Sequence, residues 1–239
     1  MLLGGRFPIS LYLAANQQPS TCMATIDFID PYLAGDDGLV AIGGEFTTEN
    51  LLKAYRMGVF PWPTDEDSIY WVSPIERGVM FLNELHIPRS LRKDRERTAF
   101  TFTIDRDFPS VIAACAAVSR QGQVGTWIID SMIHAYCQLH ELGYAHSVEV
   151  WEGDELVGGL YGVEIDGVYA GESMFHRRTN ASKFALLHMM DHLRERGAEW
   201  IDIQMVTPHM AILGGKAVPR KEFLDMLSAA QSPERKLFG

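Results

Sequence analysis

The sequence predicts an α/β (α+β) fold in which a small N-terminal domain, residues 1–75, packs on a larger domain, residues 76–239. Two observations predict it. Prolines and aromatic side chains crowd the stretches "FPWP" and "IYWVSP", which indicates a rigid connection and places the boundary near Pro74. Beyond Pro74, stretches with strand and helix periodicity alternate, and three consecutive strands with tight turns favour a mixed, mostly antiparallel sheet.

Composition limits the function classes. The 239 residues are 47% hydrophobic and 22% charged, which is typical of a soluble globular protein. The formal net charge of -10 predicts repulsion from nucleic acid, so any contact with RNA requires a local basic patch. Three cysteines without a C-x-x-C pair favour a reducing compartment, and no apolar run reaches the length of a membrane span. We therefore expect a cytoplasmic protein that does not associate with membranes.

The elements expected along the first half of the chain begin with a helix over residues 47–58. Thr47 or Thr48 can cap this helix and Gly58 lies near its end. Strands follow at residues 78–82 and 99–105, with the basic segment "PRSLRKDRER" between them. Helices are expected at residues 108–119 and 131–143, capped by Asp107 and Asp130 respectively.

Three consecutive strands dominate the second half, at residues 146–151, 155–164 and 167–175, joined by tight turns. An amphipathic helix over residues 180–197 follows, and then a strand over residues 200–206. A short turn of helix around residues 209–213 and a helix over residues 219–230 complete the chain.

Polar side chains interrupt two of the strands that otherwise look buried. Glu172 lies near the end of one strand, while Asp202 and Gln204 are two residues apart on the next and share a face. Each can accept a proton or a hydrogen bond. The residues alone leave two interpretations open with equal weight: these groups line a reaction cleft, or they satisfy neighbouring backbone groups.

The order of elements resembles the Gcn5-related N-acetyltransferase (GNAT) fold. In that family the fourth and fifth strands splay apart and the reacting acyl group lies between them, and the polar side chains occupy the corresponding two strands here. The family binds the coenzyme A pyrophosphate with a glycine-rich loop before the following helix. The loop "SMFHRRTNAS" contains no glycine, so we expect an acyl donor other than acetyl coenzyme A.

A closer resemblance is carried by "GLVAIGGEFTTENLLKAYRMGVFPWP", "GTWI", "ELVGGLYGV", "GESMF", "NASK" and "IDIQMVTPHMAILGG". Together these stretches resemble the leucyl/phenylalanyl-tRNA–protein transferases, in order from about Gly38 to Leu227. The resemblance implies transfer of leucine, phenylalanine and, less readily, methionine from aminoacyl-tRNA to proteins with N-terminal Arg or Lys, which marks those proteins for degradation. It implies no cofactor and no metal.

The resemblance also implies roles for particular residues. Asp202 and Gln204 lie near the chemistry and Glu172 at the acceptor or aminoacyl site. The resemblance implies an apolar pocket that binds the donor side chain and is lined by Leu160, Tyr169, Met174, Met189 and Ile201. For two of these residues, Tyr169 and Met189, the resemblance leads us to expect phenylalanine, so the balance among Leu, Phe and Met donors stays open.

Two further groups of residues are expected to contact the tRNA. Trp62 and Trp127 match the adenosine site, with Tyr55 nearby, because a terminal adenine can stack on an exposed ring. The basic segment interrupts an otherwise acidic protein, and in the family it holds the acceptor stem. Its candidate phosphate contacts are Arg89, Arg92, Lys93 and Arg97.

Other interpretations remain open. The chain can be an aminoacyl-tRNA-dependent ligase with another amine acceptor, or a tRNA-binding or degron-binding adaptor without catalysis. The latter is kept open by His176, Ile203 and Ile212, which replace smaller or different residues beside the site. His188 and His192 lie four apart on one helix, but no third ligand accompanies them, so we expect no metal site. We expect a monomer.

Overall fold

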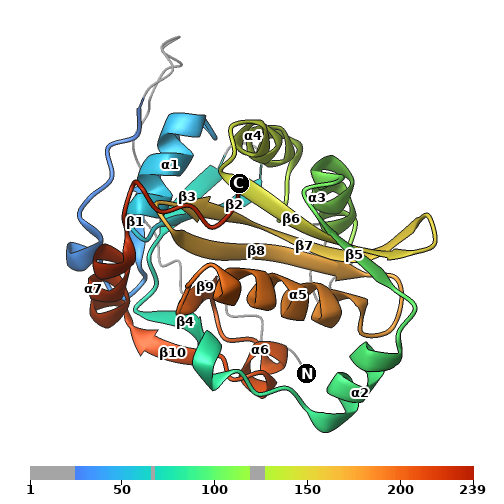
Figure 1. Ribbon diagram of the computed structural model, residues 1–239. Coiled ribbons are helices and arrows are strands. Elements are labelled where there is room, and N and C mark those ends of the chain that lie inside the picture. The colour runs from blue at the N-terminus through green and yellow to red at the C-terminus, as the bar shows by residue number, and fades with distance from the viewer. Residues whose placement is uncertain (1–24, 66–67, 119–126) are drawn as a thin grey trace.

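The computed structural model describes residues 25–65, 68–118 and 127–239, and the described chain forms two sheets (Figure 1). The smaller sheet is antiparallel, has the strand order β1-β3-β2, and is accompanied by one helix. These elements are β1 (Leu39–Ile42), α1 (Thr48–Arg56), β2 (Phe60–Asp65) and β3 (Ser68–Val72), preceded by the 3-10 turn η1 (Pro31–Leu33). The predicted cap of the helix is confirmed at Thr47, whose side chain accepts a hydrogen bond from the Asn50 backbone N–H.

The larger sheet has the strand order β10-β4-β9-β8-β7-β6-β5. Its strands are β4 (Glu76–Phe81), β5 (Thr101–Ile104), β6 (Ala145–Glu152), β7 (Glu155–Ile165), β8 (Val168–His176), β9 (Trp200–Gln204) and β10 (Lys216–Pro219). Among the described strands, only β8 and β9 run parallel, and their register contains a single pair, Ala170 opposite Asp202. The predicted mixed, mostly antiparallel sheet is confirmed, and its two central strands diverge beyond that pair.

Helices cover both faces of the larger sheet (Figure 1). α3 (Phe108–Ala116) and α4 (Asp130–Glu141) pack on one face and share an apolar core with the smaller sheet. α5 (Ala181–Glu195) packs on the other face and forms a second apolar core with β7, β8 and β9. The remaining elements lie at the periphery: η2 (Leu82–Glu84), α2 (Arg89–Arg97), α6 (Pro208–Ile212) and α7 (Arg220–Ala230).

Most predicted elements are confirmed, with local corrections. Asp107 caps α3 by accepting from the Ser110 backbone N–H. The cap predicted at Asp130 is wrong, because Ile129 occupies the N-cap position and Asp130 is the first residue of the helix. The strand predicted over residues 200–206 ends at Gln204, where the backbone turns left-handed. The boundary near Pro74 stays a prediction: the two sheets lie on either side of it.

Of the helices that the structure describes, none has both the length and the apolar character needed to cross a membrane.

Candidate active site

Glu172 and Gln204 meet across the divergence of β8 and β9. The Gln204 side-chain amide donates to Glu172 Oε1 at 2.6 Å, and the Tyr55 hydroxyl donates to the same oxygen at 2.8 Å. The Tyr55 hydroxyl also shares a hydrogen bond with Tyr136, which lies on α4. Since Tyr55 directs its proton to Glu172, Tyr136 must donate to Tyr55. One carboxylate therefore ends a chain of hydrogen-bonding groups drawn from four elements.

The environment of Glu172 favours its neutral form. Burial raises the pKa of this carboxyl from 4.5 to about 7, and the nearby Asp202 charge adds to the increase. Hydrogen bonds from Tyr55 and Gln204 and the charge of Arg77 lower the pKa and offset part of the effect. A carboxyl with a pKa of about 7 can take a proton from an α-ammonium group, whose own pKa is about 7.7–8.0.

Asp202 is held in a buried ion pair with Arg77. Arg77 donates through Nε to Asp202 Oδ1 at 2.9 Å and through Nη2 to Asp202 Oδ2 at 2.6 Å. The backbone N–H of Gln204 donates to Asp202 Oδ1 at 2.8 Å. The carboxylate is thus fixed by two side-chain bonds and one backbone bond, in the bidentate geometry that gives the strongest arginine pairs. Asp202 orients the Gln204 backbone and carries no free oxygen in an open cleft.

Arg77 was not among the predicted site residues. Its guanidinium lies between the rings of Phe60 and Phe223, 4.5 Å from each ring centroid, and donates to the Gly58 carbonyl at 3.2 Å. Gly78 lets β4 approach β9 here, because a Cβ atom at this position would lie 2.7 Å from the Met205 carbonyl carbon. The signal in the sequence is a charged residue beside glycine at the start of an apolar strand, which cannot reveal its partner.

Gln204 has an unusual backbone conformation. Its φ of 58° lies in the left-handed region, which non-glycine residues adopt infrequently and at some cost in energy. The bond from its N–H to Asp202 stabilises this turn, and the turn directs the side chain towards Glu172. The Arg77–Asp202 pair therefore positions Gln204, and Gln204 in turn contacts Glu172.

The predicted donor-pocket residues gather on the opposite face of the sheet, under α5. Four of them are core members of the second apolar cluster: Leu160, Tyr169, Met189 and Ile201. The fifth, Met174, is partly buried and packs against this cluster. The cluster is closed in this structure, with Tyr169 only 2% exposed. The Tyr169 hydroxyl has no hydrogen-bond partner among the described residues.

The two predicted adenosine-site tryptophans also come together. The rings of Trp62 and Trp127 are nearly parallel, at 3°, with centroids 5.9 Å apart. Both side chains are half-buried and pack against the apolar core that contains Tyr55. Gly125 and Thr126, which complete the "GTWI" motif, lie outside the described residues. The structure thus places a stacked aromatic pair on the same core as the Glu172 hydrogen-bond chain.

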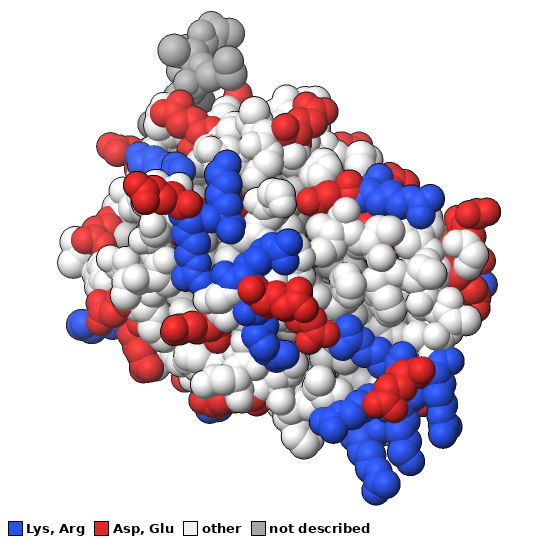
Figure 2. All heavy atoms as spheres, viewed as in Figure 1, with Lys and Arg blue, Asp and Glu red and all other residues white. Residues whose placement is uncertain are grey.

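The basic segment forms α2 at the edge of the molecule, where Figure 2 shows a cluster of blue side chains at the lower right. Its exposed cations have no ion pair with a described carboxylate; they are Arg89, Arg92, Lys93 and Arg97. Arg95 differs, because it donates to Asp191 on α5 at 2.8 Å. A cavity of about 120 Å³ lies between α2, the start of α5 and α6, lined in part by Ser90, Lys183 and His209.

Comparison with known proteins assigns the family. Residues 79–228 match the family model described as leucyl/phenylalanyl-tRNA protein transferase, and residues 44–75 match the model of its N-terminal domain. The chain belongs to this transferase family. It is 49% identical to a leucyl/phenylalanyl-tRNA–protein transferase of Syntrophobacter fumaroxidans over 201 residues, 84% of this chain and 86% of that one. A transferase with the same name from Pseudoalteromonas atlantica is 48% identical over 83% of this chain and 84% of its own.

The predicted family and the predicted enzyme class, an aminoacyltransferase, are therefore confirmed. Among solved structures, L-PGS from Bacillus licheniformis aligns with a TM-score of 0.40 and 15% identity, covering 55% of this chain and 46% of that one. Sequence reasoning located Glu172, Asp202 and Gln204 but missed Arg77 and Tyr136, the two groups that complete the transferase's buried polar network.

Proposed function

We propose that this transferase moves leucine, phenylalanine and, less readily, methionine from aminoacyl-tRNA to the N-terminal Arg or Lys of proteins, which marks those proteins for degradation. The observation that carries the proposal is the position of Glu172. Its carboxyl has a pKa of about 7, accepts from Gln204 and Tyr55, and lies where β8 and β9 diverge. An amine that arrives there meets a proton acceptor of matched pKa.

The reaction needs little activation and accurate positioning. An aminoacyl ester is already activated, so the neutral α-amine attacks the carbonyl carbon, the new C–N bond forms, and the ester C–O bond breaks. The leaving group is the ribose oxygen of the terminal adenosine, which takes up a proton. In this proposal Glu172 receives the proton of the attacking amine and returns it to the leaving ribose oxygen, and the Tyr55–Tyr136 chain stabilises the ionised carboxyl.

Gln204 and Asp202 take supporting roles. The Gln204 amide orients the attacking amine or the carbonyl while it remains bonded to Glu172. Asp202 holds the Gln204 turn and is itself fixed by Arg77, so it acts as a positioning residue and does not take up the proton. Since the acceptor carries a cationic side chain, the ionised form of Glu172 favours N-terminal Arg or Lys over neutral residues, whereas the charge of Asp202 is already balanced by Arg77.

The remaining residues bind the donor. The aminoacyl side chain enters the cluster of Leu160, Tyr169, Met174, Met189 and Ile201, whose methionines accept several apolar shapes. The terminal adenosine stacks at Trp62 and Trp127, and α2 contacts phosphates of the acceptor stem. The protein acts as a cytoplasmic monomer without a cofactor, and the domain boundary near Pro74 separates residues 1–75 from residues 76–239.

The test is a transfer assay with the purified protein. Radiolabelled leucine or phenylalanine should move from its charged tRNA to a peptide that begins with Lys or Arg, without ATP, metal or coenzyme A. Peptides that begin with Ala or Glu are the negative controls. If charged tRNA binds but no peptide is labelled, the adaptor function replaces this proposal. If label passes only to a small amine, the protein is a ligase with another acceptor.

A matched pair of variants assigns the proton acceptor. Glu172→Gln should reduce transfer at least about a hundredfold, the usual contribution of a positioned acid or base. Glu164→Gln changes another carboxyl, which is buried and accepts from the Gly167 backbone N–H at 2.7 Å, and should keep most of the activity. Equal losses in both variants would refute the role of Glu172.

A further inference from the structure

The C-terminal tail, residues 231–239, leaves α7 and crosses back over the larger domain (Figure 1). Its start is anchored by backbone and side-chain bonds: the Ser232 N–H donates to the Asp166 carbonyl at 2.8 Å, and the Gln231 amide donates to the Arg56 carbonyl at 2.9 Å. Arg235 donates to the Gly197 carbonyl. The last apolar residues are buried, with Leu237 0% and Phe238 8% exposed. The tail is thus part of the core.

Phe238 lies between two histidines from different elements. Its ring stacks on His146 of β6 at a centroid distance of 3.8 Å and on His192 of α5 at 4.6 Å. The His192 Nε2 donates to the Leu237 carbonyl at 3.0 Å, which fixes the tail backbone at the same point. Two aromatic contacts and one hydrogen bond therefore hold this ring in one position.

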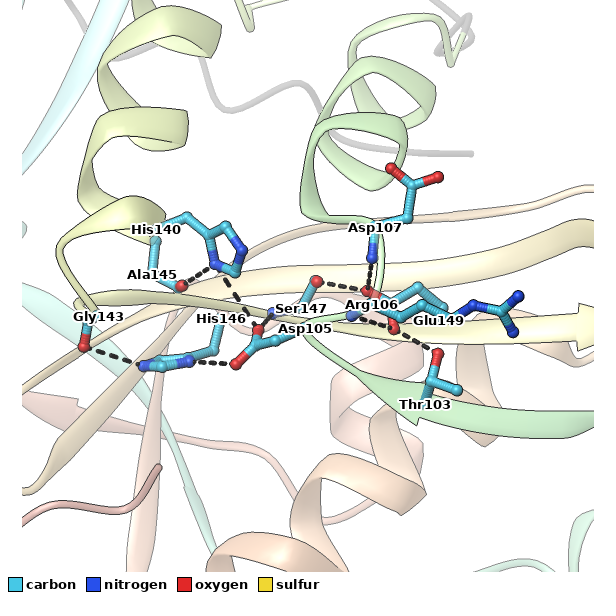
Figure 3. Close-up of polar contacts among 10 residues, drawn as sticks. All are labelled: Thr103, Asp105, Arg106, Asp107, His140, Gly143, Ala145, His146, Ser147 and Glu149. Atoms are coloured by element: carbon cyan, nitrogen blue, oxygen red, sulfur yellow. Dashed lines mark hydrogen bonds and ion pairs between the residues drawn. The ribbon is translucent and has the colours of Figure 1, made fainter. Parts of the chain in front are cut away.

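The ring of His146 is itself held firmly (Figure 3). Its Nδ1 lies within hydrogen-bond distance of Asp105 Oδ2, at 2.6 Å, and its Nε2 lies 3.2 Å from the Gly143 carbonyl oxygen. Asp105 also accepts from the Ser147 backbone N–H at 2.8 Å. Because each ring nitrogen faces an oxygen acceptor, rotation of the His146 ring would take its N–H away from that acceptor. Phe238 consequently packs against a fixed surface.

Phe238 touches the predicted donor pocket. Its ring centroid lies 5.9 Å from that of Tyr169 on β8, with the two ring planes at 41°. His192 follows Met189 by three residues on α5, so these two side chains are neighbours along one helix face. Phe238 thus lies at one end of the apolar cluster that contains Leu160, Tyr169, Met189 and Ile201.

We propose that Phe238 forms the end wall of the donor side-chain pocket and limits the size of the aminoacyl side chain that the enzyme transfers. This inference rests on the proposed function. The wall acts through contact with Tyr169: while Phe238 stays in place, Tyr169 cannot move towards β6 to make room. Since the cluster is closed, a donor side chain enters only by displacing its lining, and a ring requires a larger displacement of Tyr169 than a branched four-carbon side chain does.

Truncation of the wall tests the inference. Phe238→Ala should raise the ratio of kcat/KM for phenylalanine over leucine by about tenfold or more, since one methylene in an apolar pocket alters discrimination by about 10–200-fold. Phe238→Leu removes less volume and should shift the ratio in the same direction by a smaller factor. The control is Leu237→Ala, which opens a cavity in the same tail but leaves the Phe238 ring; its ratio should stay within about twofold of the wild type.

The ratio is measured by competition, with both charged tRNAs in one reaction and an Arg-initiated peptide as acceptor. A loss of folded enzyme then cancels, because both donors meet the same molecules. Parallel loss for both donors in Phe238→Ala, or an equal shift in Leu237→Ala, would overturn the wall while the proposed function stands. A wild-type protein that transfers neither amino acid would overturn both.

Discussion

Glu172 makes the stability of this transferase depend on pH in a way that one substitution can isolate. Burial raises the pKa of the carboxyl from 4.5 in the unfolded chain to about 7 in the folded protein. Between these values the folded state keeps a proton that the unfolded state releases. The contribution of the group to folding is therefore fully present below about pH 4.5 and is lost as the pH rises through about 7.

The magnitude follows from the shift. At about 1.4 kcal/mol per pKa unit, the increase to about 7 corresponds to roughly 3 kcal/mol of stability lost between pH 4.5 and pH 8. Glu172→Gln keeps the shape and the acceptor oxygen for Tyr55 and Gln204 but has no charge to desolvate. The variant should match the wild type near pH 4.5 and exceed it by about 3 kcal/mol at pH 8.

Urea denaturation of both proteins at half-unit intervals from pH 4.5 to pH 8 measures this difference. Other titrating groups, such as His188 and His192, contribute equally to both and cancel. Glu164→Gln is the control that separates stability from catalysis: burial also raises the pKa of Glu164, so its stability effect has the same sign, yet transfer should persist. A difference curve for Glu172→Gln that stays flat would show that Glu172 ionises normally, and would remove the basis for its role as proton acceptor.

Four further predictions concern the neighbouring groups. Arg77→Met should lower the free energy of unfolding, measured by urea denaturation, by about 3–5 kcal/mol, because it leaves the buried Asp202 charge unpaired. The double variant with Asp202→Asn should recover part of this loss, and no recovery would refute the pairing. Arg92→Ala with Lys93→Ala should reduce the slope of log affinity for tRNA against log salt by about 2, whereas Lys221→Ala on α7 should leave it unchanged. Trp62→Ala should weaken binding of an adenosine-terminated donor fragment by about 1–3 kcal/mol in calorimetry, and unchanged binding would place the base elsewhere. Tyr55→Phe removes a hydrogen bond that lowers the Glu172 pKa, so the acidic limb of the pH–rate profile should move above about pH 7, while Tyr32→Phe, whose hydroxyl bonds Asp225, should not move it.

Local patterns predicted the elements whose causes are local. The helices α1 and α3 begin after the predicted capping residues, and Gly143, with φ of 77°, follows the end of α4 as expected. The three strands β6, β7 and β8 were predicted within about two residues at either end, because their alternation and their turns are both encoded within a few residues.

The strands that the sequence did not reveal are short or lie at sheet edges. Pro61 and Pro63 interrupt the strand pattern, yet both belong to β2, which is an edge strand of the described smaller sheet and needs fewer ladder donors. β10 has four residues and pairs only with β4 among the described strands. Such segments take their structure from the neighbour that they join, which a local pattern does not contain.

The site shows the same division between local and distant causes. Asp202 and Gln204 could be found because two polar residues stand two apart in an apolar strand. Their partners could not: Arg77 lies 125 positions before Asp202, and Tyr136 reaches Tyr55 from another helix over 81 positions. A helix pattern predicts that Tyr136 is buried, and it contains no information on which hydroxyl the ring will meet.

The smaller N-terminal part takes a direct part in building the active site. Tyr55 hydrogen-bonds the Glu172 carboxyl, the Gly58 carbonyl accepts from Arg77, and the Phe60 ring covers one face of that guanidinium. These three contacts come from α1, the turn after it and the start of β2, while the groups that they support lie on β8 and β4. Without these contacts, Arg77 would keep only Asp202 and Glu172 only Gln204 as polar side-chain partners in the described chain. The packing of the two parts therefore sets both the Glu172 pKa and the position of Gln204, so a substitution far from the strands, at the interface of α1, can alter transfer without touching the substrate.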